Sequence, residues 1–439
     1  MHDIYLPWTR YPVIKPKHVV HLHNRVDLPK LTELNHAICY GNGRSYGDCC
    51  LTEGTLILTR GLDRFIAFDV ETGVLRAEAG VMLQEVLQLA IPKGWFLPVT
   101  PGTQFVTLGG AVANDVHGKN HHRMGTFGCH VKSFELMRSN GERLICSAQE
   151  NADFFAATIG GLGLTGIITW VELQLRAIVS PKLVQDTIRF NSLEEFFEIN
   201  AESEATHEYT VAWVDCLSKG SQLGRGVFFR ANHDVETNDL TYVSSKKKNP
   251  FLFRPPFSLI NRVSLTMFNQ LYWHSHPTHR TGQKVDYEPY FYPLDKVSQW
   301  NLMYGPKGFL QYQCVIPTEY AKQGIAEILK LISDSSHGSF LSVLKTFGDK
   351  KSPGMLSFPT PGATLALDFP RASGTINTLL IKMDTVVKNY GGKLYPAKDW
   401  RMTTQMLGVP KETFKRWSTF ADPFFTSRLF QRLNESEHL

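Results

Sequence analysis

Residues 107–128, which read TLGGAVANDVHGKNHHRMGTFG, constrain the fold more strongly than any other stretch of this 439-residue sequence. Gly109 and Gly110 have no Cβ, so the backbone there can turn sharply against a bound group and leave its N–H donors free. The polar cluster that follows, from His117 to His122, is too rich in His and Lys for an ordinary turn. The segment is therefore predicted to form the floor of a cofactor site, with the glycine pair against a diphosphate.

Composition restricts the class of protein. With 43% apolar and 20% charged residues, we expect a soluble globular protein that is long enough for two domains. The net charge of +5 is not gathered into one long basic run, so no nucleic acid partner is expected. No apolar run of about 18 residues occurs, and the first residues lack the pattern of a signal peptide. A cytoplasmic location is expected.

The cysteines and histidines do not indicate a metal site. The seven cysteines form an odd set without a Cys-x-x-Cys pair, which disfavours both a disulfide framework and a zinc site. The adjacent Cys49 and Cys50 could be redox-active, although small buried thiols are more common. His117, Lys119 and His121 resemble metal-ligand spacing, but no carboxylate or thiolate is clearly added to them. No metal is expected.

The first 178 residues alternate short strands with a few helices. Strands are predicted at residues 36–40, 56–59, 131–137 and 143–146, with a hairpin over 65–79 and a further strand after Gly166. Helices are predicted at 82–92 and 152–158, the first from apolar residues at the spacing of one helix face. This half of the chain is predicted to be α+β.

Two glycine motifs in this half invite comparison with a nicotinamide-type fingerprint. Residues 161–166 match G-x-G-x-x-G, but a strand follows where the dinucleotide fold needs a helix. Residues 41–47, GNGRSYG, follow a strand, yet their glycines are spaced differently and no amphipathic helix comes next. We interpret them as a loop whose amides form an anion-binding nest, although each motif taken alone fits a plain turn.

The second half is predicted to be another α+β unit. Helices are predicted at 192–203, from about Leu294, at 320–335 and at 375–390, and strands at 209–215, 226–230, 309–316, 340–346 and 364–368. We therefore divide the chain into a first domain over residues 1–178, a second over 179–392, and a segment over 393–439 that returns to the first.

Residues 246–292 are rich in basic and aromatic side chains and include Pro255 and Pro256. One interpretation is a solvated loop. The alternative is a lipid-facing mouth, because basic side chains hold phosphates while aromatic rings sit well at a membrane interface. The second interpretation predicts a peripheral contact with the inner face of a membrane.

The order of four blocks, GNGRSYGD, LPVTPGT, TLGGAVANDVHG and GLGLTGII, resembles the FAD-binding (PCMH-type) domain of the vanillyl-alcohol-oxidase class of flavoenzymes. The resemblance implies a two-domain α+β fold, FAD as the cofactor, and an oxidoreductase. It places the first block around the diphosphate, Ile167 by the adenine end and the HGKNHH segment beside the isoalloxazine. The cofactor-binding residues that it implies are Gly41, Asn42, Gly43, Arg44, Ser45, Tyr46, Gly47, Gly102, Thr107, Gly109, Gly110, Asn114, His117, Ile167 and Tyr395.

Many members of that class carry a histidine in the first loop that bonds covalently to the flavin. Arg44 stands at that place in this chain. Because a guanidinium cannot form that bond, we expect FAD to be bound without a covalent link.

Further blocks, among them GFLQYQCVIP, LALDFP and GGKLYPAKD, are similar to the decaprenylphosphoryl-ribose oxidase family, the flavoprotein half of an epimerase that makes the arabinose donor of mycobacterial cell walls. The resemblance covers nearly the whole chain. It implies oxidation of the 2′-hydroxyl of a polyprenylphosphoryl-β-D-ribose to a keto sugar, and a separate NAD(P)H-dependent reductase that consumes this product. The chain departs from the family at Ala366, where the mycobacterial enzyme has an active-site cysteine.

The same resemblance implies the residues of the substrate pocket, which are Tyr46, Lys119, Gln311, Gln313, Lys345 and Lys398. Oxidation of a secondary alcohol requires a group that takes the hydroxyl proton. Lys398 is expected to be that catalytic group if burial lowers its pKa, and His117 is the second candidate. Taken alone, Lys398 could instead pair with Asp399 at the surface.

Two other functions stay open at this stage. One is an alditol or aldonolactone oxidase that acts on a free polyol with oxygen. The other is a flavin-fold binding protein without turnover, which the intact Lys398 and the two glutamines disfavour.

Overall fold

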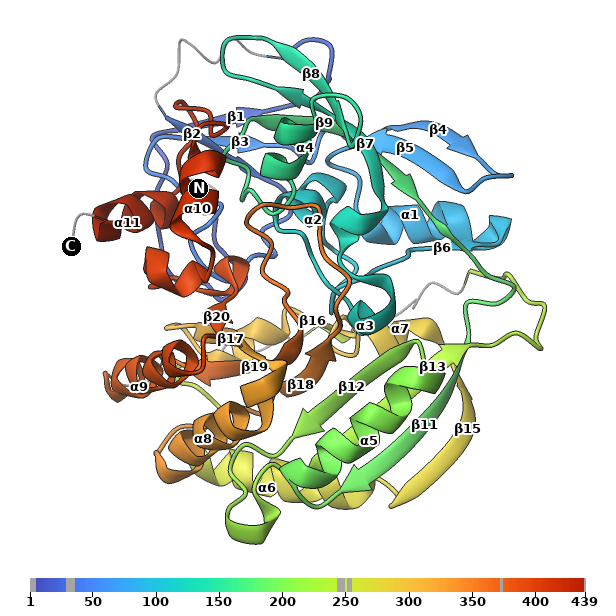
Figure 1. Cartoon of the computed structure of the whole chain (residues 1–439), viewed down its shortest axis with the longest axis vertical. Coiled ribbons are helices and arrows are strands. Elements are labelled where there is room, and N and C mark those ends of the chain that lie inside the picture. The colour runs from blue at the N-terminus through green and yellow to red at the C-terminus, as the bar shows by residue number, and fades with distance from the viewer. Residues whose placement is uncertain (1–4, 29–35, 243–248, 251–254, 372–373, 438–439) are drawn as a thin grey trace.

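A computed structural model describes residues 5–28, 36–242, 249–250, 255–371 and 374–437. The chain forms two sheet-based parts that lie one above the other in Figure 1, with the N-terminal part at the top and the second part below. Helices and strands are mixed in both parts, which confirms the predicted α+β class.

The N-terminal part contains a parallel and an antiparallel sheet. The parallel sheet has the order β1-β3-β2, with β1 (His18–His21), β2 (Ala37–Tyr40) and β3 (Thr55–Leu58). The antiparallel sheet has the order β4-β5-β9-β7-β8, with β4 (Phe65–Asp69), β5 (Val74–Glu78), β7 (Val131–Met137), β8 (Arg143–Ser147) and β9 (Ile167–Gln174). A two-stranded ribbon pairs β6 (Trp95–Phe96) with β10 (Arg176–Ala177).

Four helices belong to this part, namely α1 (Leu83–Ala90), α2 (Leu108–Ala113), α3 (His121–Met124) and α4 (Ala152–Thr158). α1 buries the apolar face that its spacing predicts, and a short 3-10 turn continues it to Lys93. Its buried side chains join those of the antiparallel sheet in one core.

The second part is built on one eight-stranded sheet with the order β15-β11-β13-β12-β18-β19-β17-β20. Its neighbouring strands are all antiparallel. The strands are β11 (Leu183–Phe190), β12 (Tyr209–Val214), β13 (Gly226–His233), β15 (His279–Val285), β17 (Phe309–Pro317), β18 (Ser342–Phe347), β19 (Gly362–Pro370) and β20 (Lys393–Leu394).

The two faces of the large sheet have different neighbours. One face packs into a core with α5 (Leu193–Thr206), α8 (Ala321–Asp334) and α9 (Thr375–Asn389). Alternate residues of the same strands point to the opposite face, because side chains of a strand alternate. That opposite face looks toward the N-terminal part and, at one end, toward α6 (Arg262–Ser275), whose Trp273 packs on Trp213 and Val227.

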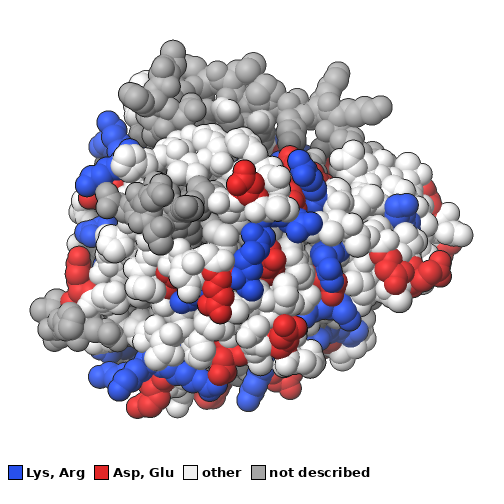
Figure 2. Space-filling model, turned by 90° about the horizontal axis from the view of Figure 1, so that it is seen from above, with Lys and Arg blue, Asp and Glu red and all other residues white. Residues whose placement is uncertain are grey.

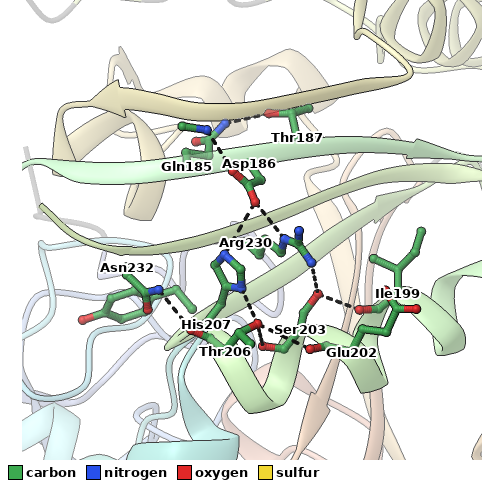
Figure 3. A network of polar contacts seen from close by, with 12 residues as sticks. Gln185, Asp186, Thr187, Ile199, Glu202, Ser203, Thr206, His207, Arg230 and Asn232 are labelled. Carbon is green, nitrogen blue, oxygen red and sulfur yellow. Dashed lines mark hydrogen bonds and ion pairs between the residues drawn. The ribbon is translucent and has the colours of Figure 1, made fainter.

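Figure 3 shows a polar network that fixes the end of α5 over β11 and β13, on the helix-covered face. Asp186 accepts from the Arg230 Nε at 3.0 Å and lies 3.6 Å from the His207 Nε2. Arg230 also donates to the Ser203 hydroxyl of α5 at 3.2 Å. The network therefore holds α5 to the sheet, and these four residues do not contribute to the opposite face of the sheet.

The C-terminal segment crosses between the two parts. β20 pairs with β17 in the large sheet, whereas α10 (Lys411–Ser418) and α11 (Arg428–Glu437) lie beside the parallel sheet at the top left of Figure 1. The Phe425 backbone forms a bridge with Ala37, and Arg432 pairs with Asp48. We propose the domain division given above, with the return to the first domain starting after Leu394.

Two secondary-structure predictions are wrong. Residues 246–292 are not the solvated loop of the first interpretation, because they contain α6, the edge strand β15 and α7 (Tyr287–Phe291), while residues 246–248 and 251–254 lie outside the described part. No helix begins at Leu294, because the chain turns there and Val297 enters the two-residue strand β16 (Val297–Ser298), which pairs with β14 (Asn249–Pro250). Gln299 then takes a left-handed φ of 58°, which separates β16 from a 3-10 turn.

Figure 2 views the molecule from the end occupied by the N-terminal part. On this face, the coloured basic and acidic side chains are interspersed. Among the described residues, no helix is both long and apolar enough to span a membrane.

Candidate active site

A cavity of about 630 Å³ lies between the two parts of the molecule. Its walls come from the loop after β2, from α2 and the loop that follows it, and from the face of the large sheet opposite α5, α8 and α9. The C-terminal segment closes it with the 3-10 turn Pro396–Lys398, which follows β20. Segments separated by about 350 residues thus meet in one site.

Most of the predicted site residues line this cavity. They are Gly41, Asn42, Gly43, Arg44, Ser45, Tyr46, Gly102, Thr107, Gly109, Gly110, Asn114, His117, Lys119, Gln311, Gln313, Lys345, Tyr395 and Lys398. Gly47 and Ile167 do not. A Cβ on Gly47 would lie 1.9 Å from the Asp399 carbonyl oxygen, so this glycine permits a close backbone approach. The Ile167 side chain is fully buried in a small core with Ala37 and Ile57, while its neighbours Gly166 and Ile168 reach the cavity.

The prediction of a sharp turn with free N–H groups at Gly109 and Gly110 is wrong. Both residues lie in the first turn of α2, which Thr107 caps by accepting from the Gly110 N–H at 3.2 Å. The Gly109 N–H donates to the Ala79 carbonyl at 2.8 Å. A Cβ on Gly109 would lie 3.0 Å from the Ala79 Cβ, so the glycine allows α2 to approach Ala79 closely.

The cavity fits a large polar cofactor such as FAD. The Arg44 Nε and the Asn114 Oδ1 are buried in its wall and find no hydrogen-bond partner within the described part of the chain. Buried polar atoms are rarely left unpaired, so both are suited to a ligand. The Tyr395 hydroxyl donates to the Asn114 carbonyl at 2.9 Å, and its ring stacks on Phe358 at 4.8 Å. The loop after β2, the helix α2 and the turn Pro396–Lys398 would together hold the cofactor.

FAD is expected to be released from the protein by acid precipitation. The Arg44 guanidinium stacks over the Trp8 ring at 4.1 Å, and no nucleophile replaces the missing histidine at this position. After centrifugation, the yellow colour should stay in the supernatant. Flavin retained in the pellet would show that another side chain, such as His117 or a cysteine, forms a covalent bond.

Three lysines converge on the part of the cavity formed by the large sheet. We call Lys119, Lys345 and Lys398 the lysine cluster. Burial lowers the pKa of each of them to about 7, and the charges of the other two members lower the pKa of Lys345 further. The cluster therefore lacks enough negative charge to balance it within the protein and is suited to an anionic ligand.

His117 connects the lysine cluster to the glutamines. The Lys345 ammonium donates to the His117 Nδ1 at 2.9 Å and to the Gly118 carbonyl at 2.9 Å. The His117 Nε2 lies 3.0 Å from the Gln313 Nε2, which also donates to the Thr364 hydroxyl at 3.2 Å. Both ring nitrogens of His117 are therefore in hydrogen bonds, and the basic one accepts in either tautomer.

This arrangement assigns His117 a positioning role. Burial, followed by the charge of Lys345, holds the His117 pKa well below its usual range, so the ring is neutral. Its only basic nitrogen already accepts a hydrogen bond. The structure therefore does not favour the prediction that His117 takes a proton in the reaction.

Asp368, which the sequence analysis did not identify, influences the charge of Lys398. The Lys398 Nζ lies 3.5 Å from the centre of the Tyr46 ring, and the negative charge of Asp368 opposes the lowering of the Lys398 pKa by burial. Asp368 is fully buried, and burial raises its own pKa to about 7. Its Oδ1 accepts from the Gln311 amide at 2.5 Å, while Oδ2 has no hydrogen-bond partner among the described residues.

The interpretation of Lys398 as a surface residue paired with Asp399 is wrong. The Asp399 carboxylate accepts the backbone N–H groups of Arg401 and Met402, both at 2.5 Å, and Lys398 points into the cavity. The signal for Asp368 was a carboxylate inside the apolar strand LALDFP, which requires a partner or a function.

Ala366 lies on the same wall. It is the register partner of Gln313 and lines the cavity. A methyl group therefore occupies the place where the resemblance implies a cysteine, and this part of the wall offers no thiol.

Comparison with known proteins assigns the class. The FAD binding domain family matches residues 13–147, which contain the loop after β2, helix α2 and the segment with His117. Over 416 residues the chain is 36% identical to the decaprenylphosphoryl-β-D-ribose oxidase of Mycolicibacterium smegmatis, covering 90% of this chain and 88% of that protein. It is 29% identical over 375 residues to an uncharacterized protein of Streptomyces coelicolor, covering 80% of this chain and 100% of that protein. An L-gulonolactone oxidase of Mus musculus is 32% identical over 136 residues, which is 30% of either chain.

Fold, cavity and domain match define an FAD-dependent oxidoreductase with the FAD-binding fold of the vanillyl-alcohol-oxidase class, as predicted. Similarity over nearly the full length of both chains specifies the group within this class. The chain belongs to the decaprenylphosphoryl-β-D-ribose oxidase family.

Proposed function

We propose that this protein oxidises the 2′-hydroxyl of a polyprenylphosphoryl-β-D-ribose to the 2-keto sugar, with FAD as the electron acceptor. The relative in Mycolicibacterium smegmatis carries the name of this activity. The observation in this chain that carries the proposal is the lysine cluster, because a sugar linked to a lipid through phosphate brings an anion into the site.

The charge balance of the pocket supports a phosphate over a neutral substrate. Lys119, Lys345 and Lys398 face the cavity, and burial depresses the pKa of each to about 7. An anion beside Lys119 and Lys345 would stabilise their charged forms and form hydrogen bonds that are stronger than those between neutral groups. A free polyol would not stabilise the charged forms of these two lysines, whereas Lys398 already has the charge of Asp368 near it.

The reaction requires the pocket to remove one proton and to hold one carbon in place. Bound FAD would supply the acceptor for the hydride that leaves the carbon carrying the hydroxyl. Lys398, with a pKa of about 7, is neutral in a large fraction of molecules near neutral pH and can then accept the hydroxyl proton. The Nζ of Lys398 lies over the Tyr46 ring at 3.5 Å, and the negative charge of Asp368 acts on it.

The remaining residues would orient the sugar phosphate. Gln311 is anchored by Asp368 through its amide nitrogen, and its Oε1 has no hydrogen-bond partner in the described structure. His117 contacts both Gln313 on β17 and Lys345 on β18, two strands that β19 separates. Positioned donors and acceptors of this kind reduce the entropy lost when the substrate reaches a reactive geometry.

Binding of the sugar phosphate is expected to weaken as the pH rises above about 7. The pKa of Lys345 is about 7 in the free protein, and an anion raises it in the complex. The affinity that this lysine provides is therefore fully present below pH 7 and is lost as the pH rises toward the higher pKa of the complex. Lys345→Met should weaken binding at pH 6 by about 10-fold or more, since a charged hydrogen bond is worth about 1.5–3 kcal/mol. Calorimetric titration from pH 6 to pH 9 measures both effects.

Lys393→Met is the matched control for that titration. Lys393 is also buried, with its pKa lowered to about 8, but it does not line the cavity. This variant should keep the affinity and pH dependence of the parent. Equal affinity of the parent and the Lys345 variant at pH 6 would contradict a phosphate site at Lys345.

The alternative function is that of an alditol or aldonolactone oxidase, whose substrates are neutral polyols. The lactone oxidase match of this chain extends over only 30% of it, whereas the match to the ribose oxidase extends over 90%. Anaerobic flavin reduction by farnesylphosphoryl-β-D-ribose, compared with xylitol and gulonolactone at equal concentrations, tests the choice. Reduction by the polyols but not by the ribosyl phosphate would favour the alternative, and reduction by none would favour a binding protein without turnover.

The product implies a second enzyme. A 2-keto sugar that remains attached to its lipid phosphate must be reduced again to give the inverted alcohol. We propose that a separate NAD(P)H-dependent reductase performs this step.

We also propose a peripheral contact with an anionic membrane surface on the cytoplasmic side. Residues 240–285 contain seven Lys or Arg and no Asp or Glu, a composition that favours anionic lipid. Within this segment, Val263, Met267 and Leu271 recur at intervals of four on α6 and are 71%, 61% and 68% exposed, respectively. We call these three residues the apolar stripe. An exposed apolar helix face within a segment of basic composition is typical of a surface that lies in the lipid interface.

A further inference from the structure

The cavity continues beyond the lysine cluster along the large sheet and under α6. Its wall changes there from charged to aromatic and apolar. We call this section the aromatic passage, and the residues that define it are Trp213, Phe229, Phe268, Tyr272, Phe340 and Leu341.

The rings of the passage form a continuous wall. Trp213 and Tyr272 have their ring centres 4.6 Å apart, and Tyr272 stacks on Phe268 at 5.5 Å. Phe268 meets the edge of Phe340 at 5.8 Å. Rings from the sheet side pack directly on rings from α6, so a ligand that lies along this wall would contact continuous apolar surface.

The passage is continuous with the proposed phosphate site. Val343 and Lys345 lie two residues apart on β18 and face the same side of the sheet, so they are separated by about 7 Å. Val343 is the register partner of Trp213. A lipid chain attached to a phosphate at Lys345 would therefore enter the passage at Trp213 directly and would not have to cross charged groups.

The other end of the passage reaches the surface at α6. Phe268 lines the cavity and is also 38% exposed, so we place the opening of the passage at this residue. Phe268 follows Met267, a member of the apolar stripe, directly in the sequence. The opening thus lies next to the surface that we assign to the membrane.

We propose that the aromatic passage binds the first isoprene units of the lipid chain and guides them from the membrane to the lysine cluster. This inference rests on the proposed function and deepens it, because it assigns the lipid its own subsite. Apolar burial in such a passage would favour lipid-linked substrates over short analogues with the same sugar phosphate. A hydrophilic sugar or protein segment would not match a wall of aromatic rings.

The test compares farnesylphosphoryl-β-D-ribose with ethylphosphoryl-β-D-ribose, which has the same headgroup and almost no chain. Anaerobic flavin reduction in detergent should give the parent at least a 10-fold higher kcat/KM for the farnesyl substrate. Leu341→Trp fills the passage four residues before Lys345 and should remove most of this preference, while kcat/KM for the ethyl substrate changes less than twofold. Phe268→Lys places a charge at the exposed opening and should act in the same direction without demanding space in the core.

Ile381→Trp is the matched control, because Ile381 is 59% exposed on α9, which covers the opposite face of the sheet. It should retain the full preference of the parent. Equal kcat/KM for both substrates in the parent, or equal losses on both substrates in the Leu341 and Phe268 variants, would overturn the passage while leaving the proposed function intact. Failure of both substrates to reduce the parent flavin would instead overturn the proposed function.

Discussion

Lys398→Met is expected to slow anaerobic reduction of the flavin at saturating ribosyl phosphate by at least about 100-fold, which corresponds to about 2.7 kcal/mol of barrier. The methionine keeps most of the apolar length of the side chain but removes the amine that takes the hydroxyl proton. Because Lys398 lies in the cavity wall, FAD content and thermal stability should change little. Stopped-flow absorbance of the flavin measures the rate.

Two other variants separate the roles around Lys398. Asp368→Asn removes the negative charge that opposes the lowering of the Lys398 pKa, so the pKa of Lys398 should fall further. Since neutral Lys398 is the proposed base, the rate rises with pH through this pKa, and its midpoint should move to lower pH. Gln313→Leu should weaken binding more than it slows reduction, because an orienting hydrogen bond contributes about 1 kcal/mol. Reduction of the Lys398 variant at the parent rate would show that another group is the base.

Asp115→Ala is expected to lower the free energy of unfolding by about 3 kcal/mol and to reduce the FAD content. Asp115 is fully buried and follows α2 directly. Its carboxylate accepts from the Gly128 N–H at 2.9 Å and from the hydroxyls of Ser352 and Ser357, each at 2.5 Å. Loss of the acceptor would leave three buried donors unpaired, at about 1 kcal/mol each. These contacts brace the floor of the cofactor site against residues 348–361.

Ser352→Ala serves as the control, because it removes one of the three donors and keeps the carboxylate. It should cost about 1 kcal/mol and leave the FAD content unchanged. Urea unfolding of the holoproteins, followed by tryptophan fluorescence, measures both values. A loss of no more than 1 kcal/mol in the Asp115 variant would show that the loop is held by other contacts.

Helices and strands were predictable from the sequence where the apolar residues recur at one regular spacing. α1, α8 and α9 each bury one apolar face, and the spacing of those residues identifies them without other information. α6 was missed because it is apolar on two sides. Leu265 and Trp273 face the protein, whereas the apolar stripe faces outward, so no single amphipathic face marks this helix.

The glycine pair shows a second limit of sequence patterns. Adjacent glycines predict a turn, but Gly109 and Gly110 begin α2 because Thr107 caps it and Ala79 packs against it. Thr107 follows Gly80 and Ala79 by more than 25 residues. Only the fold brings them together, so the local sequence could not reveal the reason for these glycines.

The site was accessible mainly through the resemblance. Lys119, Lys345 and Lys398 lie on three distant segments, and nothing in their spacing predicts that they meet. Asp368 could have been identified from its position in an apolar strand, since a buried carboxylate needs a partner. The aromatic passage depends on β12, β18 and α6 lying side by side. The sequence indicated its α6 part through the aromatic residues of 246–292 but not the strands that meet it.

The central claim is that this chain removes the hydride from carbon 2′ of a ribosyl phosphate. Stopped-flow reduction of the flavin with farnesylphosphoryl-β-D-ribose deuterated at carbon 2′, compared with the same molecule deuterated at carbon 3′, tests this claim most directly. The account predicts slower reduction with the 2′-deuterated substrate and an unchanged rate with the 3′-deuterated one. A slower rate with the 3′-deuterated substrate alone, or no reduction by either, would contradict it.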